Sequence, residues 1–145
     1  MKLMVECFGY PIMSHSRRML LTNYFKSIEK EKEDRVYHLE NMNEDYLLKE
    51  TKDGASILYG KLINGVKPLF DLVENNIDYA VLDMQEVEKE IGKKVLSIYS
   101  DIIKNYSSIT IKEKSSIIDE MNDLIGDNTN FFYKKTIYKV KKGDK

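Results

Sequence analysis

The sequence of 145 residues is 42% hydrophobic, which suits one domain over residues 1–145 with a buried core. Its 23 basic and 24 acidic side chains leave a formal net charge of −1, which excludes a field that draws the whole chain onto nucleic acid. Cys7 is the only cysteine, so the chain forms no internal disulfide and supplies too few thiolates to hold an iron–sulfur cluster or a structural zinc alone.

Membrane and secretion signals are missing from this sequence. No apolar run reaches the length that crosses a bilayer, and Glu6 interrupts the N-terminal apolar stretch before a signal-peptide core could form. We therefore expect a protein of the reducing cytoplasm that contacts no membrane.

The first quarter of the chain predicts a strand followed by a helix. Residues 2–8 (KLMVECF) read as a strand, which Gly9 and Pro11 end. The helix is predicted from apolar side chains at helical spacing, which are Leu20, Leu21, Tyr24, Phe25 and Ile28. Ser14 or Ser16 is the predicted cap of its first turn, and the mixed charges of residues 26–35 predict its exposed end.

A small antiparallel meander is predicted next. Its strand candidates are residues 36–40, 46–50 and 55–59. Asp53-Gly54 supplies the turn between the last two, since glycine takes positive φ without a Cβ clash.

The second half of the chain alternates helix and strand in the manner of an α/β unit. A helix follows Gly65, residues 78–83 predict a buried strand closed by an acid, and residues 85–106 predict the longest helix. These apolar faces can cover one another.

The C-terminal region predicts one more helix and a strand. Thr110 and Glu113 form a capping box at the helix start, and Gly126 ends the helix. Residues 131–140 predict a final strand, and residues 141–145 a frayed tail.

The segment between the first strand and the first helix carries the densest run of reactive side chains, namely Ser14, His15, Ser16, Arg17 and Arg18. Ligands of α/β folds bind beyond the carboxyl ends of strands, and Asp83 ends the strand 78–83 at the same rim. His15 and Asp83 are therefore candidate catalytic groups, with the serines and arginines as candidate anion-binding groups. The alternative is a serine cap with arginines in solvent, which the sequence by itself favours. No metal-ligand spacing is present.

The C-terminal residues 131–145 interleave aromatic rings with six lysines and contain one aspartate. The candidate RNA-binding residues here are Lys134, Lys135, Lys139 and Lys141. An edge strand whose lysines discourage pairing with other strands is an equally good interpretation.

Three stretches in this order resemble the collagenase-like peptidase family U thirty-two. They are FGYPIMSHSRRMLLTNYF, SILYGKLINGVKPLFDLVENNIDYAVLDM and NTNFFYKKTIYKVK. The resemblance is to the C-terminal part of the short bacterial members. That family's fold is a (β/α)₈-type barrel, which takes about 250 residues.

The resemblance therefore implies an α/β fold: a partial (β/α) barrel-like unit with a small antiparallel meander insertion and a C-terminal strand. Residues 2–8 and 78–83 would be its last two barrel strands. Either the chain is a piece of a longer protein, or a partner chain completes the barrel, or the residues fold as a reduced α/β domain. Because a partial barrel exposes sheet edges, we expect an oligomer.

The resemblance also bears on function. Better-studied members are RNA hydroxylases and oxygen-independent ubiquinone-pathway hydroxylases, several of which hold an iron–sulfur cluster through four cysteines. Two of those cysteine positions fall on Ile12 and Met19 here, so the resemblance implies no cofactor bound by this chain alone.

The short members resemble partners that act beside an iron–sulfur relative in hydroxylating the wobble uridine of tRNA, with prephenate implied as oxygen donor. The resemblance thus implies a non-catalytic or co-catalytic component of that reaction. A collagenase-like peptidase or peptide-binding fragment is the alternative, although the residues show no convincing nucleophile–base–acid set.

Overall fold

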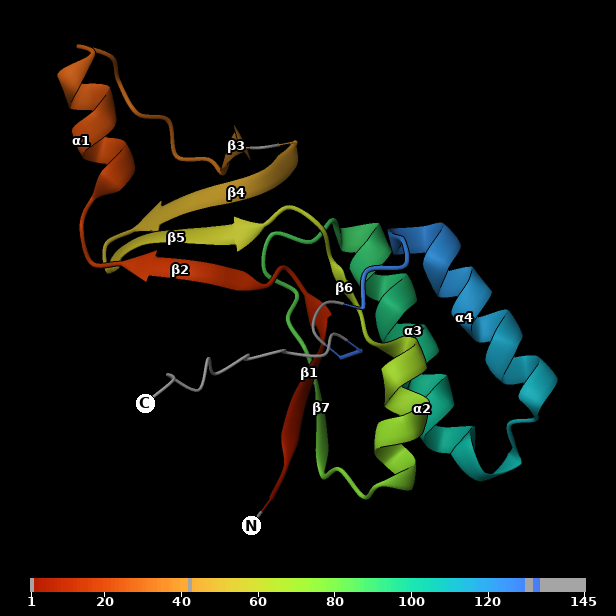
Figure 1. The fold of residues 1–145 in the computed structure, drawn as a ribbon. Coiled ribbons are helices and arrows are strands. Elements are labelled where there is room, and N and C mark those ends of the chain that lie inside the picture. The colour runs from red at the N-terminus through yellow and green to blue at the C-terminus, as the bar shows by residue number, and fades with distance from the viewer. Residues whose placement is uncertain (1, 42, 130–131, 134–145) are drawn as a thin grey trace, which may run out of the picture.

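The computed structural model describes residues 2–41, 43–129 and 132–133. These residues have a mixed α/β fold with two sheets and four helices, in which α1 (Leu20–Ser27) lies beside one sheet and the other three helices lie beside the other (Figure 1). None of the helices in this described part has the length and apolar composition of a membrane crossing.

A three-stranded sheet has β1 (Met4–Gly9) at its centre, between β6 (Ile63–Asn64) and β7 (Tyr79–Leu82). β1 runs antiparallel to β6 and parallel to β7, so the two strands predicted at residues 2–8 and 78–83 are parallel neighbours. The helix that directly precedes β7 in the chain belongs to the crossover connection that two parallel strands require.

Three helices cover one face of this sheet: α2 (Val66–Glu74), α3 (Lys89–Asn105) and α4 (Ile111–Ile125) (Figure 1). A short turn of 3₁₀ helix, η1 (Tyr106–Ser108), joins α3 to α4. Side chains from β1 and all three helices form the main core, which contains the fully buried Phe8, Val66, Val95, Tyr99, Ile102 and Met121. The predicted packing of helix, strand and helix over residues 65–106 is confirmed.

The predicted capping box of α4 is also confirmed. Thr110 accepts a hydrogen bond from the Glu113 backbone N–H, while the Glu113 carboxylate accepts from the Thr110 backbone N–H. Gly126 follows the last helical residue, as the sequence predicts.

The second sheet has four antiparallel strands in the order β2-β5-β4-β3. The predicted meander is confirmed as β3 (Tyr37–Asn41), β4 (Glu44–Thr51) and β5 (Gly54–Tyr59). The fourth strand, β2 (Ile12–Ser16), is a segment that the sequence predicts as a loop, and that prediction is wrong. Its residues hydrogen-bond along β5, where Ile12 pairs with Leu58 and Ser16 with Ala55.

The first helix also begins differently from the prediction. α1 (Leu20–Ser27) starts after Met19 and has no serine cap, since Ser16 accepts a hydrogen bond from Arg18 instead. The Glu50 carboxylate of β4 replaces the cap, because it accepts hydrogen bonds from the Leu21 N–H at 2.8 Å and the Thr22 N–H at 3.1 Å. A negative charge at a helix N-terminus is also favoured by the helix dipole.

Two further predictions concern segment ends. α1 ends at Ser27, so most of residues 26–35 form a connection to β3 and not the end of the helix. The predicted strand 131–140 and tail 141–145 lie outside the described residues, apart from positions 132 and 133, which lie in a turn.

Replacing Ile102 with alanine is expected to lower the free energy of unfolding by about 2–5 kcal/mol, because its side chain is 1% exposed in the main core. Ile103, its neighbour on α3, is 61% exposed, so Ile103→Ala should change stability by less than about 0.5 kcal/mol. Urea unfolding of the two variants measures the difference. Equal losses at both positions would contradict the orientation of α3.

Replacing Glu50 with alanine is expected to cost about 1–3 kcal/mol, since it leaves the Leu21 and Thr22 N–H groups without their acceptor. Hydrogen exchange at these two amides should accelerate. The matched control is Glu40→Ala at an exposed position on β3, with an expected change below about 0.5 kcal/mol. Unchanged exchange in the Glu50 variant would show that α1 does not depend on this contact.

Candidate functional site

The carboxyl ends of the parallel strands β1 and β7 meet at one place. The Asp83 N–H donates a hydrogen bond to the Phe8 carbonyl at 2.8 Å, which brings Asp83 against Gly9. Gly9 has φ 137°, and a Cβ at this position would lie 2.8 Å from the Asp83 Cβ. Glycine is therefore required for the two strand ends to approach so closely.

An open groove of about 710 Å³ lies beside these strand ends, and we call it the Glu6–Asp83 groove. Its lining includes Met4, Glu6, Ile12, Val81, Asp83 and Gln85. Met4 pairs with Tyr79 and Glu6 with Val81, which places these side chains on the sheet face opposite to the Val5–Ala80 pair. Because Val5 and Ala80 pack against the helical core, the groove lies on the face that α2, α3 and α4 leave open.

Two carboxylates, Glu6 and Asp83, line this groove. Burial and the negative charge of Asp83 raise the pKa of Glu6 above its ordinary value. Asp83 accepts a hydrogen bond from the Gln85 N–H at 2.9 Å, which fixes the start of the loop to α3. A carboxyl group with a raised pKa can hold and release a proton closer to neutral pH, which suits acid–base chemistry.

Glu6 was not among the residues singled out from the sequence. The sequence feature that could have indicated Glu6 is its position as a charged residue within an otherwise apolar strand, two residues from the buried Phe8.

His15 lies on β2 and faces Ser56 of β5, with 2.9 Å between the His15 Nδ1 and the Ser56 hydroxyl oxygen. Ser56 in turn pairs with Lys49 of β4, and the Lys49 ammonium forms an ion pair with Glu86 of the loop after β7. A polar row of His15, Ser56, Lys49 and Glu86 therefore runs across β2, β5 and β4 and reaches the loop that follows Asp83.

This row and the Glu6–Asp83 groove occupy one continuous side of the molecule. Ile12 lines the groove and pairs with Leu58, which is two residues from Ser56 on β5 and so shares its face. The structure thus places the predicted His15 and Asp83 on the same side. It does not bring them into contact, since His15 is three residues farther along β2 than Ile12.

The two predicted serines are separated from His15. Ser14 pairs with Ile57 and Ser16 with Ala55, on the opposite sheet face, because neighbouring strand residues alternate in direction. Ser14, His15 and Ser16 thus lie on a strand, with the two serines on the face opposite to His15.

Arg17 and Arg18 lie in the turn between β2 and α1 and are exposed. Within the described part of the chain, neither guanidinium group forms a hydrogen bond or ion pair. Both are placed to meet an anion from solvent. The candidate RNA-binding residues Lys134, Lys135, Lys139 and Lys141 lie outside the described residues.

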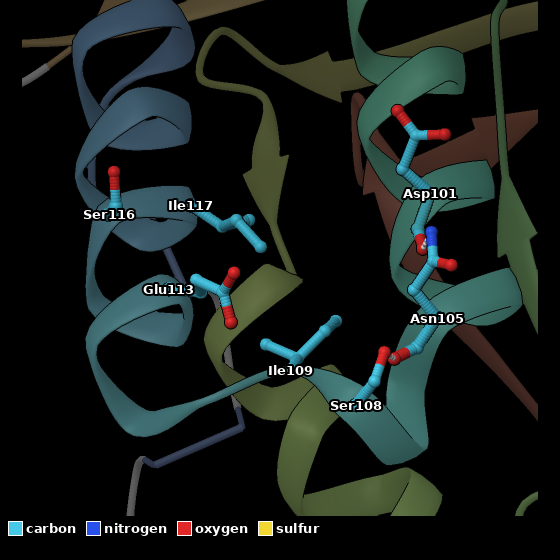
Figure 2. Close-up of a pocket in the computed structure, with 7 residues that line it drawn as sticks. All are labelled: Asp101, Asn105, Ser108, Ile109, Glu113, Ser116 and Ile117. Atoms are coloured by element: carbon cyan, nitrogen blue, oxygen red, sulfur yellow. Dashed lines mark hydrogen bonds between the residues drawn. The ribbon is translucent and has the colours of Figure 1, made fainter.

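A second groove of about 360 Å³ separates α3 from α4. Figure 2 shows Asp101 and Asn105 of α3 on one side of it, with Glu113 and Ser116 of α4 on the other. The Glu113 carboxylate is occupied by hydrogen bonds from Thr110, which lower the pKa of Glu113. One of the polar groups that line this groove is therefore already engaged in the cap of α4.

The described residues contain no group of three or more histidine, cysteine, aspartate or glutamate side chains that could hold a metal ion. Burial, with the charge of Glu6, raises the pKa of the Cys7 thiol to about 11, so at neutral pH it is protonated and unsuited to act as a nucleophile or ligand.

No protein-family model matches this chain, and searches of curated proteins and of solved structures found no match either.

Glu6→Gln is expected to raise stability and to remove one component of its pH dependence. The raised pKa means that the folded state binds the Glu6 proton more tightly than the unfolded state, so stability falls as pH rises from about 4.5 through the folded-state pKa. Urea unfolding at several pH values above about 4.5 measures this slope. Glu40→Gln, at an exposed position, is the control, and an equal effect of both variants would contradict the assignment.

Proposed function

We propose that the chain is the C-terminal part of a protein like those of family U thirty-two, and that it is a non-catalytic or co-catalytic component of tRNA wobble-uridine hydroxylation in the cytoplasm. The observation that carries this proposal is that the parallel strands β1 and β7 both end at the Glu6–Asp83 groove. In barrel enzymes the site lies at the carboxyl ends of the strands, formed by the loops that follow them.

The helix-free face of the three-stranded sheet supports the barrel part of the proposal. Parallel sheets are normally covered on both faces, and in a barrel the face opposite the helices turns inward. Here that face carries Met4, which is 70% exposed, and Tyr79, which is 50% exposed. A further chain, or a further part of a longer chain, would supply the remaining strands and bury these side chains.

The position of Ile12 supports the same assignment. In the family resemblance Ile12 occupies a position where cluster-bearing members have cysteine, and here its side chain lines the groove and is 62% exposed. An iron–sulfur relative acting as partner would then provide the redox centre. The role left to this chain is to bind and orient the substrates.

The binding roles follow from charge. Arg17 and Arg18 would pair with a phosphate or with the carboxylates of prephenate, because the arginine fork binds both in a bidentate manner. His15 would donate a hydrogen bond from β2, and the Asp83 carboxylate would accept one at the edge of the groove. Lys134, Lys135, Lys139 and Lys141 would contact the RNA backbone.

A collagenase-like peptidase is the second candidate, and one observation favours it. The His15 Nδ1 lies 2.9 Å from the Ser56 hydroxyl oxygen, which is the contact between a base and a nucleophile. Among the described residues no carboxylate hydrogen-bonds the His15 ring, so the third member that orients such a base is missing from this part of the chain. The hydroxylase component is for that reason the first candidate.

The RNA-binding part of the proposal predicts that tRNA binding weakens steeply with salt. Lys134→Ala with Lys135→Ala should reduce the slope of log affinity against log salt by about two, as expected for two lost phosphate contacts. Fluorescence anisotropy with labelled tRNA measures it. Lys93→Ala with Lys94→Ala, exposed on α3, changes the net charge equally and should leave the slope nearly unchanged.

Measurements of tRNA binding and of gelatin cleavage separate the two candidate functions. No tRNA binding at low salt, by the chain alone or with the partner that completes the barrel, would rule out the hydroxylase component. Gelatin cleavage that Ser56→Ala and His15→Ala both abolish would establish the peptidase.

A further inference from the structure

Residues 12–59, which we call the β2–β5 unit, have an interior of their own. Their buried apolar side chains are Leu21, Leu47, Ala55 and Leu58. Among the described residues, the main core and the side chains packed against it include no member of this unit. Figure 1 shows the unit standing to one side of the three-stranded sheet and its helices. A unit that shares no core with its neighbour is free to turn as a rigid body.

The chain passes between the β2–β5 unit and the three-stranded sheet at two short connections. Gly9 still pairs with Ile63, and the Pro11 carbonyl already accepts a hydrogen bond from the Tyr59 N–H, so Tyr10 is the one residue between these contacts. The return connection consists of residues 60–62, between β5 and β6. Hinges are a few residues at the ends of elements that absorb changes in φ and ψ. The two connections lie side by side and have the positions of a hinge.

An ion pair joins the β2–β5 unit to the rest of the chain at a place away from these connections. The Lys49 ammonium of β4 pairs with the Glu86 carboxylate in the loop between β7 and α3. Glu86 has φ 60°, in the left-handed region that glutamate seldom adopts, so contacts around it must stabilise this conformation. The pair with Lys49 is such a contact. Its side chains are 37% and 24% exposed, and a pair of this exposure is weak enough to break and re-form.

The Glu6–Asp83 groove is lined by residues from both sides of the hinge. Ile12 belongs to β2, whereas Glu6 and Asp83 belong to the three-stranded sheet and its strand ends. Turning the β2–β5 unit therefore moves Ile12 relative to the two carboxylates. The loop that carries Glu86 also supplies Gln85 to the groove lining, so the ion pair acts directly beside the groove.

We propose that the β2–β5 unit turns about Tyr10 and residues 60–62 to open and close the Glu6–Asp83 groove, and that the Lys49–Glu86 ion pair stabilises the closed form. The structure corresponds to this closed form. The turning itself does not depend on the proposed function, whereas its use in admitting and enclosing substrates rests on that function. Enclosure matters there because a groove that closes excludes water and fixes the orientation of what it binds.

The test measures the distance between two spin labels by pulsed electron paramagnetic resonance on the full chain. One label is placed at Lys52→Cys, in the turn between β4 and β5 at the end of the unit remote from the hinge. The other is placed at Ser115→Cys, an exposed position on α4. Cys7 is fully buried and should take no label.

The doubly labelled protein is expected to show one main distance at low salt and a minor second distance. Lys49→Gln and Glu86→Gln should each raise the ratio of the second distance to the first by about 1.5- to 5-fold, the range for loss of one exposed ion pair. Raising the salt concentration to about 1 M should act in the same direction, because it screens the pair. Both substitutions lie at the surface, so the variants should remain folded, which circular dichroism verifies.

Two further variants separate the ion pair from local side-chain effects. Lys49→Glu combined with Glu86→Lys exchanges the charges and should restore the original ratio of distances. Lys93→Ala breaks the exposed Lys93–Glu90 pair within α3 and is the matched control, with no expected change.

An unchanged distance distribution in both glutamine variants would overturn the proposal. A second distance that persists after the charge exchange would also overturn it, because the ion pair would then not be what stabilises the closed form. These distances are measured without RNA. Absence of tRNA binding would therefore refute the proposed function and leave the hinge itself standing.

Discussion

The carbonyl oxygen of Cys7 connects the three-stranded sheet to the helices that cover it. It accepts hydrogen bonds from the Gly65 N–H at 2.8 Å and from the Tyr99 hydroxyl at 2.9 Å. It therefore connects β1 to the first residue before α2 and to the middle of α3. A Cβ on Gly65 would lie 2.5 Å from this oxygen, so the contact admits only glycine. The Tyr99 hydroxyl is deeply buried, and burial raises the pKa of Tyr99, which keeps it a donor. The position of the Glu6–Asp83 groove follows, because the same anchoring of β1 leaves its other face free.

Much of this fold can be predicted from the sequence where one face of an element is buried. α2 and α3 bury Leu69, Val95 and Ile102 in the core, and their apolar spacing predicts both helices. The meander and the Thr110 cap are likewise signalled by local residues. The sequence does not predict β2, because most of its side chains are exposed on both faces. Its strand conformation depends on hydrogen bonds to β5, which lies more than 35 residues away in the chain and has no local signature in β2.

The sequence reveals the candidate-site residues that a local pattern marks, and it does not reveal those that strand pairing brings together. Asp83 is recognisable because it directly follows an apolar strand, and the structure does place it at the strand ends, although β7 is only partly buried. The cluster Ser14, His15 and Ser16 is misleading because proximity in sequence becomes opposite orientation in a strand. Ser56 and Lys49 become neighbours of His15 only through the pairing of β2, β5 and β4. The raised pKa of Glu6 depends on Asp83, a residue from another strand.

The chain enters and leaves the four-stranded sheet at neighbouring points, beside the three-stranded sheet. The Tyr59 N–H donates a hydrogen bond to the Pro11 carbonyl at 2.8 Å, and Gly9 pairs with Ile63 just beyond. Residues 12–59 therefore depart and return at nearly one point, like a domain inserted into a host. Evolution can lengthen, shorten or replace such an insertion without moving β1 against β7. Specificity for a new partner can thus change in the insertion while the strand ends that form the groove remain where they are.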